Sequence, residues 1–228
     1  MITQKYLILN TTYTNPVKIT PEYLIVHSTG SAVGTKEKLF NNWNKPDALS
    51  VHGMVDDKGS LHTLPLNYLA YHVGKKGNSK TIGFEICEPS NMAYVDKNHT
   101  TVDKVKYNPK DPKNIADFNK RWDNAVEIAV KFCRETGLTA DKVISHAEGY
   151  QKGVASNHAD TAHWFKLFGK DMDDFRADVK KELAKKPNPN TGGTLYRVQV
   201  GAFVNRNNAL RLQLELKAKG YNAIIKED

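Results

Sequence analysis

The sequence has few cysteines and no long hydrophobic run. Its two cysteines, Cys87 and Cys133, fall in apolar segments and form no C-x-x-C pair, which argues against a zinc ribbon or a redox dithiol. No apolar stretch approaches the roughly 20 residues of a membrane-spanning helix, so we expect no membrane partner. The first residues, MITQKYLILNTTY, contain one lysine and no small-residue cleavage site, and we predict no signal peptide.

Basic residues are in excess over acidic ones. The 228 residues include 33 Lys and Arg against 25 Asp and Glu, a formal net charge of +8. Such a surplus favours polyanions, including nucleic acid, anionic membranes and anionic cell-wall polymers. Lysines far outnumber arginines and no basic run is long, so a nucleic-acid-binding function rests on net charge alone. We therefore expect no nucleic-acid partner.

The sequence divides into a larger and a smaller part. KKPNPNTGG at residues 185–193 is rich in Pro and Gly, which is typical of a linker. We predict a domain over residues 1–184 and a small βαβ unit over residues 194–228. The elements expected in this unit are a strand, an amphipathic helix and a second strand: Leu195–Val200, Asn207–Lys219 and Tyr221–Ile225. The unit is smaller than the roughly 40 residues at which domains become self-sufficient.

Strand and helix patterns alternate in the larger part, which predicts an α/β fold. Residues 1–20 show little periodicity and are expected to form an extended arm. The expected strands are Tyr23–Ser28, Thr81–Cys87 and a hairpin made of Leu49–Val55 and Ser60–Leu64. The expected helices are Ser31–Asn44, with Thr35 as N-cap, then Asn114–Thr136, ended by Gly137, and Asp171–Lys185.

Two apolar runs end in histidine. YLIVHST at residues 23–29 places His27 at the end of a strand, and Val143-Ile144 runs into Ser145-His146. Further along, His158 and Asp160 lie two residues apart. Imidazole and carboxylate groups bind Zn²⁺, and a catalytic zinc keeps one position for water. A single histidine at a strand end is more often a core residue, but this combination predicts a metal site.

Glu85 interrupts the apolar run TIGFEIC. A carboxylate inside a buried strand is costly unless it is paired or faces a cleft. Either the strand is solvent-exposed at that point, or Glu85 is a general base whose proton affinity burial raises and a metal moderates. Among the remaining histidines, we predict substrate contacts for His52, on the hairpin, and for His72, in the groove-lining segment AYHVG.

These motifs together resemble those of the type-2 family of zinc-dependent N-acetylmuramoyl-L-alanine amidases, which includes phage endolysins and bacterial autolysins. The motifs are YLIVHST, SVHGMVDDKG, AYHVG, TIGFEICEP and ISHAEGY followed by SNHADTAHW, over about residues 20–185. The resemblance implies a central mixed β-sheet flanked by helices, with zinc in a groove on one face. It also implies hydrolysis of the amide that joins N-acetylmuramic acid to L-alanine in peptidoglycan.

The resemblance assigns metal ligands by motif position. His27 and His146 match the first two zinc ligands. The third, Cys or Asp in the family, matches Asp160, and the residue that steadies the oxyanion matches His158. The usual Lys is replaced here by His158 and a Pro that commonly follows the third ligand by Thr161, so His158 stays an alternative third ligand.

Glu85 matches the acidic residue that many members use as catalytic base. Some relatives instead use a Tyr just before the hairpin histidine, and Val51 occupies that position here. The chemistry that the resemblance implies needs Zn²⁺ and no organic cofactor.

The tail also resembles a known repeat. YRVQVGAF and AKGY are similar to the sporulation-related (SPOR) repeat, which binds peptidoglycan glycan strands. A whole domain of that type has two βαβ halves, and this chain carries one. Either a second half is missing, or two chains pair as a homodimer, or the unit is a remnant without binding function. Gln199, Phe203 and Arg206 are the candidate glycan contacts.

Two functions stay open. The first is a wall-lysing zinc amidase that acts on peptidoglycan and approaches anionic wall polymers through its positive charge. We expect such a protein to be made in the host cytoplasm and released to the wall, like an endolysin, or secreted by a non-standard route. The second is a non-catalytic peptidoglycan-binding module. Such modules tend to lose a zinc ligand, and the intact set His27, His146 and Asp160 favours the enzyme.

Overall fold

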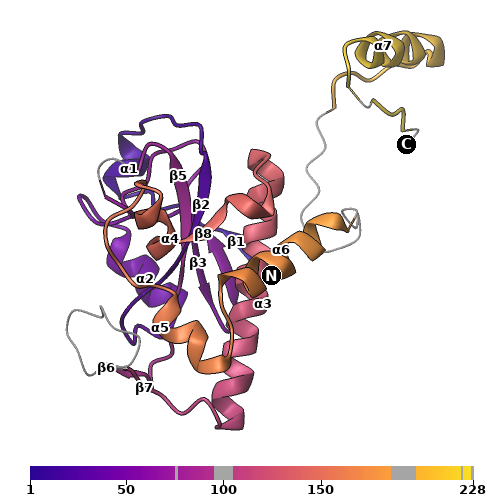
Figure 1. Cartoon of the computed structure of the whole chain (residues 1–228). Coiled ribbons are helices and arrows are strands. Elements are labelled where there is room, and N and C mark those ends of the chain that lie inside the picture. Colours follow the sequence, from indigo (N-terminus) through magenta and orange to yellow (C-terminus); the bar gives the residue numbers. More distant parts are fainter. Residues whose placement is uncertain (75–76, 95–104, 186–198, 222, 227–228) are drawn as a thin grey trace. The chain divides into compact units, whose positions relative to one another are not determined.

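The chain forms two compact units. The computed structural model describes residues 1–74, 77–94, 105–185, 199–221 and 223–226 (Figure 1). The units are Met1–Lys186 and Pro187–Asp228. The linker predicted at residues 185–193 lies outside the described residues except for Lys185, and so does most of the strand expected at Leu195–Val200.

A six-stranded mixed sheet forms the centre of the larger unit (Figure 1). In spatial order its strands are β1 (Ile2–Gln4), β4 (Gly59–His62), β3 (Gly53–Asp56), β5 (Thr81–Ile86), β2 (Tyr23–Ser28) and β8 (Val143–Ser145). β3 and β4 form an antiparallel hairpin, and every other neighbouring pair is parallel. The α/β fold with a mixed sheet is thus confirmed. The carboxyl ends of β5, β2 and β8 share one edge, where open α/β sheets bind ligands.

Helices cover both faces of this sheet. Helices α3 (Pro112–Thr136) and α6 (Met172–Ala184) pack on one face. Helix α2 (Lys36–Trp43) contacts β3, and helix α4 (His146–Gln151) contacts β2 and β8. The short elements are α1 (Thr11–Thr14), α5 (Ala162–Phe165), the 3₁₀ turns Ala140–Lys142 and Lys166–Phe168, and a separate pair of strands, β6 (Ala93–Tyr94) and β7 (Val105–Lys106). None of the described helices has the length and apolar composition that crossing a membrane requires.

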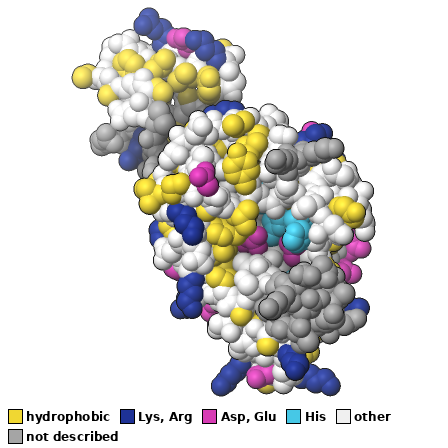
Figure 2. Space-filling model, turned by 90° about the vertical axis from the view of Figure 1, so that its left-hand side faces the viewer, with side chains coloured by type: hydrophobic (Ala, Val, Ile, Leu, Met, Phe, Trp, Pro, Cys, Tyr) yellow, Lys and Arg dark blue, Asp and Glu magenta, His cyan; other side chains and the backbone are white. Residues whose placement is uncertain are grey.

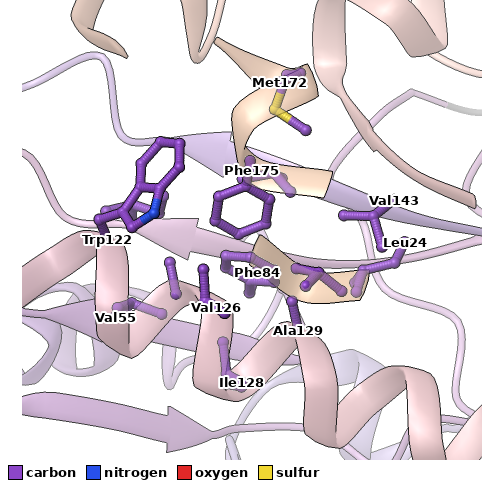
Figure 3. Close-up of a cluster of buried hydrophobic side chains, with 14 of the residues drawn as sticks. Leu24, Val55, Phe84, Trp122, Val126, Ile128, Ala129, Val143, Met172 and Phe175 are labelled. Atoms are coloured by element: carbon purple, nitrogen blue, oxygen red, sulfur yellow. The ribbon is translucent and has the colours of Figure 1, made fainter. Parts of the chain in front are cut away.

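The main hydrophobic core lies between the sheet and α3 with α6. Leu24 of β2 and Phe84 of β5 meet Val126 of α3 and Phe175 of α6 (Figure 3). Successive side chains of a strand point to opposite faces of the sheet. Val26, the neighbour of His27, belongs to the same core, so His27 and Glu85 face away from α3. The alternation that builds the core thus also places the polar side chains on the opposite face.

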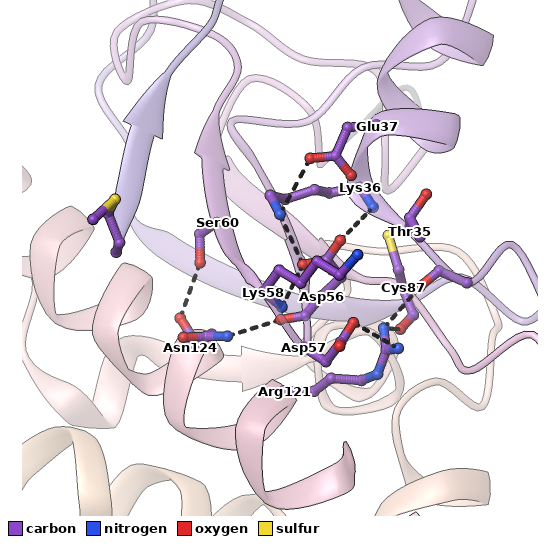
Figure 4. A network of polar contacts seen from close by, with 12 residues as sticks. Thr35, Lys36, Glu37, Asp56, Asp57, Lys58, Ser60, Cys87, Arg121 and Asn124 are labelled. Atoms are coloured by element: carbon purple, nitrogen blue, oxygen red, sulfur yellow. Dashed lines mark hydrogen bonds and ion pairs between the residues drawn. The ribbon is translucent and has the colours of Figure 1, made fainter.

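A buried polar network joins α2, the β3–β4 hairpin and α3 (Figure 4). Lys36 Nζ donates to Asp56 Oδ1 at 2.8 Å, and neither side chain is more than 9% exposed. Arg121 of α3 donates to the carbonyl of Cys87 at 2.6 Å and pairs with Asp57 at 3.3 Å. An unpaired charge at this depth would cost several kcal/mol. The network pairs these buried charges, so removing one partner would destabilise the fold.

Two segments differ from expectation. Residues 1–20 are not simply an extended arm, because β1 pairs with β4. A three-residue edge strand with mostly exposed side chains carries no hydrophobic alternation that would predict it. In the smaller unit, α7 (Arg206–Ala218) forms as predicted. The strand expected at Tyr221–Ile225 does not form in the residues described there, and no described strand lies nearby to pair with it.

Candidate metal centre

Three predicted site residues meet at the carboxyl ends of β2 and β8. His27 is the fifth residue of β2, His146 is the first residue of α4, and Asp160 lies in the loop before α5. Ser145 and Glu148 form a capping box at the start of α4. The capping box satisfies backbone N–H groups where the chain leaves β8, and it fixes the direction in which His146 projects. The side chains of His27 and His146 are only 2% and 5% exposed.

The ligand atoms of these residues form a compact triangle. His27 Nδ1 lies 3.1 Å from His146 Nδ1 and 3.0 Å from Asp160 Oδ2. His146 Nδ1 lies 3.6 Å from Asp160 Oδ1. A tetrahedral zinc ion, with bonds of about 2.0–2.2 Å, holds its ligand atoms about 3.3 Å apart. Within the described part of the chain, this is the group of His and carboxylate side chains placed to hold a metal ion.

The protonation of this cluster suits a metal site. Burial lowers the pKa of His146 to about 4, which leaves the ring neutral, as a metal ligand must be. Burial also acts to lower the pKa of His27, but the hydrogen bond to Asp160 and the nearby carboxylates outweigh it and raise that pKa. The pKa of Asp160 falls, because His27 more than offsets its burial. Without a metal the two form an ion pair, so a bound cation competes with one proton.

Glu85 lies next to the triangle. Its Cα is paired with that of His27 across β5 and β2, and its Oε2 is buried with no hydrogen-bond partner among the described residues. Burial raises the pKa of Glu85 to about 8; the charge of His27 opposes this rise, and Asp160 and Glu88 add to it. A carboxyl group with such a pKa can accept and return a proton near neutral pH. Glu85 is the one residue of β5 that is only half-buried, and it lines the groove described below.

A groove with a volume of about 740 Å³ opens over these groups. Figure 2 shows histidine and acidic side chains exposed together on this face, with hydrophobic side chains beside them. The apolar lining includes Trp43, Leu49 and Tyr71, and the last two are 56% and 47% exposed. A polar centre beside exposed apolar walls can accommodate a substrate that has both polar and apolar surface.

The other predicted residues fall in different places. His158 is exposed in the groove, with its ring centroid 4.8 Å from that of His146, but it lies outside the triangle. His72 lines the groove and its Nδ1 lies 2.8 Å from His27 Nε2. His52 is fully buried, with Nε2 bonded to the carbonyl of Tyr68 and Nδ1 accepting from the N–H of Gly83. Its ring is unavailable to a ligand, which corrects the prediction that His52 contacts substrate.

The sequence did not point to a second buried pair beside the site. His163 Nε2 lies 2.8 Å from Glu88 Oε1, and both side chains are at most 2% exposed. Burial acts to lower the pKa of His163, but Glu88 outweighs it and raises the pKa. The pair links the chain after β5 to α5 and so holds the loop that carries Asp160. Glu88 follows the strand motif TIGFEIC and His163 lies beyond the loop of Asp160, but nothing in the sequence paired the two.

The smaller unit has a groove of its own. Its volume is about 570 Å³, and its lining includes Gln199, Phe203 and Arg206. Phe203 is 45% exposed, and Gln199 Nε2 donates to the carbonyl of Gly201 at 3.4 Å. α7 buries none of its side chains. The candidate glycan contacts thus lie together in one groove.

Comparison with known proteins agrees with this geometry. The sequence model of the N-acetylmuramoyl-L-alanine amidase family (Amidase_2) matches residues 17–163, and the SPOR domain model matches residues 170–227. The second match includes α6, although Phe175 and Val179 of that helix are fully buried in the core of the larger unit. By packing, α6 therefore belongs to the larger unit.

Proteins similar to this chain include N-acetylmuramoyl-L-alanine amidases. The chain is 24% identical to the N-acetylmuramoyl-L-alanine amidase CwlA of Bacillus subtilis over 213 residues, covering 86% of this chain and 68% of CwlA. It is 24% identical to the amidase XlyB of the same organism over 195 residues, covering 82% of this chain but only 52% of XlyB. The chain therefore spans about half to two thirds of these relatives.

The fold is shared with solved structures. The hydrolase AmiA of Staphylococcus aureus, in complex with its ligand, superposes with a TM-score of 0.60 at 19% identity, covering 80% of this chain and 83% of AmiA. A mutant endolysin from Bacillus subtilis gives 0.54 at 24% identity, covering 78% and 98%. These structures share the fold, and the family match spans more than half of the chain. The chain belongs to the N-acetylmuramoyl-L-alanine amidase family, with a SPOR domain at its carboxyl end.

Proposed function

We propose that this protein is a zinc amidase that hydrolyses the bond between N-acetylmuramic acid and L-alanine in peptidoglycan. The observation that carries the proposal is the triangle of His27, His146 and Asp160 with Glu85 beside it in an open groove. Two neutral imidazoles and a carboxylate are typical ligands of a catalytic zinc. A module that only binds peptidoglycan requires neither this ligand set nor an adjacent base.

Each side chain then has a separate task. A zinc ion held by the triangle supplies Lewis-acid chemistry, which polarises a carbonyl and makes water more acidic. Glu85 accepts the proton of the attacking water and passes it to the nitrogen of L-alanine as the C–N bond breaks. His158, at the rim of the groove, donates a hydrogen bond to the oxygen that becomes negatively charged. The apolar wall at Trp43 and Tyr71 holds the substrate and excludes bulk water.

The smaller unit supports the same function, since the SPOR match indicates peptidoglycan binding there too. We place the glycan contacts at Gln199, Phe203 and Arg206. We also propose that two chains pair through this unit, because α7 buries no side chain and a second copy would cover Leu214 and Tyr221, now 66% and 65% exposed. The net charge of +8 favours approach to anionic wall polymers.

Metal content and wall clearing, measured on the same preparation, test the amidase proposal. We expect about one zinc ion per chain, in line with a single three-ligand site. Zinc-loaded protein should clear a suspension of purified walls, a chelator should stop the clearing, and added zinc should restore it. Protein that holds zinc and sediments with walls without clearing them would instead be a recognition module.

A further inference from the structure

His72 contacts His27 on the side of the ring that faces away from the proposed metal position. Its Nδ1 lies 2.8 Å from Nε2 of His27, the ring nitrogen that points away from the triangle. The two rings meet edge to face, with centroids 5.1 Å apart and an interplanar angle of 84°. A ring nitrogen can donate or accept depending on its tautomer. The partners of His72 on its far side therefore decide which of the two histidines is the donor.

Those partners favour the tautomer of His72 that carries its proton on Nε2. This nitrogen lies 3.2 Å from Thr81 Oγ1 and 3.5 Å from the carbonyl oxygen of Thr81. A carbonyl oxygen only accepts, and the hydroxyl of Thr81 has the carbonyl of Gly77 as an acceptor for its own proton at 3.0 Å. Both groups thus accept from His72 Nε2. A neutral His72 then has an unprotonated Nδ1, which accepts from His27.

This series of hydrogen bonds fixes the tautomer of His27. Because His72 Nδ1 accepts, His27 keeps a proton on Nε2 whether or not a metal is bound. Its Nδ1, at 3.1 Å from His146 Nδ1 and 3.0 Å from Asp160 Oδ2, is then the nitrogen available to a metal ion. Hydrogen bonds to the outer nitrogen of a ligand histidine fix ring orientation and make the ligand more basic.

The surroundings of His72 hold its ring in this position. The side chain of Asn78 accepts from the backbone N–H groups of His72 and Val73 at 3.2 and 3.0 Å. The ring lies against Gly83 of β5, where an added Cβ would be 2.7 Å from Cε1 of His72. Glycine at this position gives the ring the space it occupies. Tight packing leaves His72 little freedom to turn its Nδ1 away from His27.

We propose that His72 is a positioning residue. The series of hydrogen bonds from His27 through His72 and Thr81 to Gly77 orients His27 for metal binding. The inference rests on the proposed metal site. His72 does not touch the metal position or the substrate in this role. It acts by holding one nitrogen of His27 so that the other is free to bind.

Zinc affinity of matched variants tests the proposal, measured by competition with a chromophoric chelator. His72→Leu removes the acceptor and should weaken zinc binding by about 10–100-fold, as loss of an outer hydrogen bond to a ligand histidine does. His72→Asn carries an acceptor oxygen at the position of Nδ1 and should retain most of the affinity. Thr81→Val should weaken binding in the same direction but less. His62→Asn, at a buried histidine bonded to the carbonyl of Leu64, is the control and should leave affinity unchanged.

Imidazole ¹⁵N–¹H NMR of the full-length wild type gives an independent readout. We expect a neutral His72 with its proton on Nε2, in both zinc-free and zinc-loaded protein. A proton on Nδ1 of His72, or a folded His72→Leu variant with wild-type zinc affinity, would overturn the proposal. Wild-type protein that binds no zinc would overturn the proposed metal site itself. That result is distinct from a failure of the His72 proposal, in which wild type binds zinc and His72→Leu binds it equally well. Should His72→Leu not fold, Thr81→Val and the tautomer of His72 decide.

Discussion

Replacing Glu85 with glutamine is expected to lower kcat for wall hydrolysis by about 10²–10⁴-fold, the usual contribution of a general base. Glutamine has nearly the same shape but accepts no proton. Glu85 lies outside the metal triangle, so zinc content should stay unchanged. Glu22→Gln is the matched control, because that exposed carboxylate pairs with Lys80 at the surface, away from the site. A variant with full activity would remove Glu85 from the mechanism.

The same variant should make the zinc-free protein more stable. Burial raises the pKa of Glu85 to about 8 in the folded protein, above its ordinary value of 4.5. Between these pH values the folded chain holds a proton that the unfolded chain has lost, so stability falls as pH rises. Allowing for solvent in the groove, we expect Glu85→Gln to be more stable than wild type by about 3 kcal/mol above pH 8.

Denaturant unfolding in the presence of a chelator measures this difference. The stability of wild type and Glu85→Gln should agree below pH 4.5, diverge between pH 4.5 and 8, and differ by a constant amount above that. A gap that stays constant across this range would mean that Glu85 is not the titrating group.

Replacing Asp160 with asparagine is expected to weaken zinc binding by more than about 100-fold. Losing a direct ligand exceeds the 10–100-fold loss typical of an outer contact. Asp160 Oδ2 lies 3.0 Å from His27 Nδ1, within the triangle, whereas His158 is exposed and outside it. The Asp160→Asn variant should therefore lose both its zinc and its lytic activity.

His158→Gln is the companion variant. It should keep its zinc and lower kcat by about 10²–10³-fold, the effect of removing one donor to a developing oxyanion. Dialysis against trace zinc followed by metal analysis measures the zinc content of both variants. The reverse pattern, zinc lost with His158 and kept with Asp160, would make His158 the third ligand.

Much of the site could be predicted because polar residues stood out against apolar strands. His27 and Glu85 each interrupt a buried strand, and the register that pairs β2 with β5 brings them side by side. His146 was identified in the same way at the end of β8. Asp160 lies in a loop, where no periodicity applies, so its motif position and the structure together were needed to select it over His158.

Other residues were harder to place from the sequence. His52 alternates with its neighbours as a groove residue would, but packing against β5 buries it and the backbone satisfies both of its nitrogens. Glu88 and His163 are 75 residues apart and meet only in the folded chain. The short edge strand β1 pairs through its backbone, which leaves no pattern in its side chains.

Release of new amino termini from purified Gram-positive walls tests the central claim most directly. Wild-type protein, zinc-loaded, should expose free N-terminal L-alanine and no new reducing sugar ends. A chelator, or Glu85→Gln, should abolish that release. If zinc-loaded wild type binds the walls but exposes no L-alanine, or exposes a different residue or sugar end, the assignment of this site as an N-acetylmuramoyl-L-alanine amidase is contradicted.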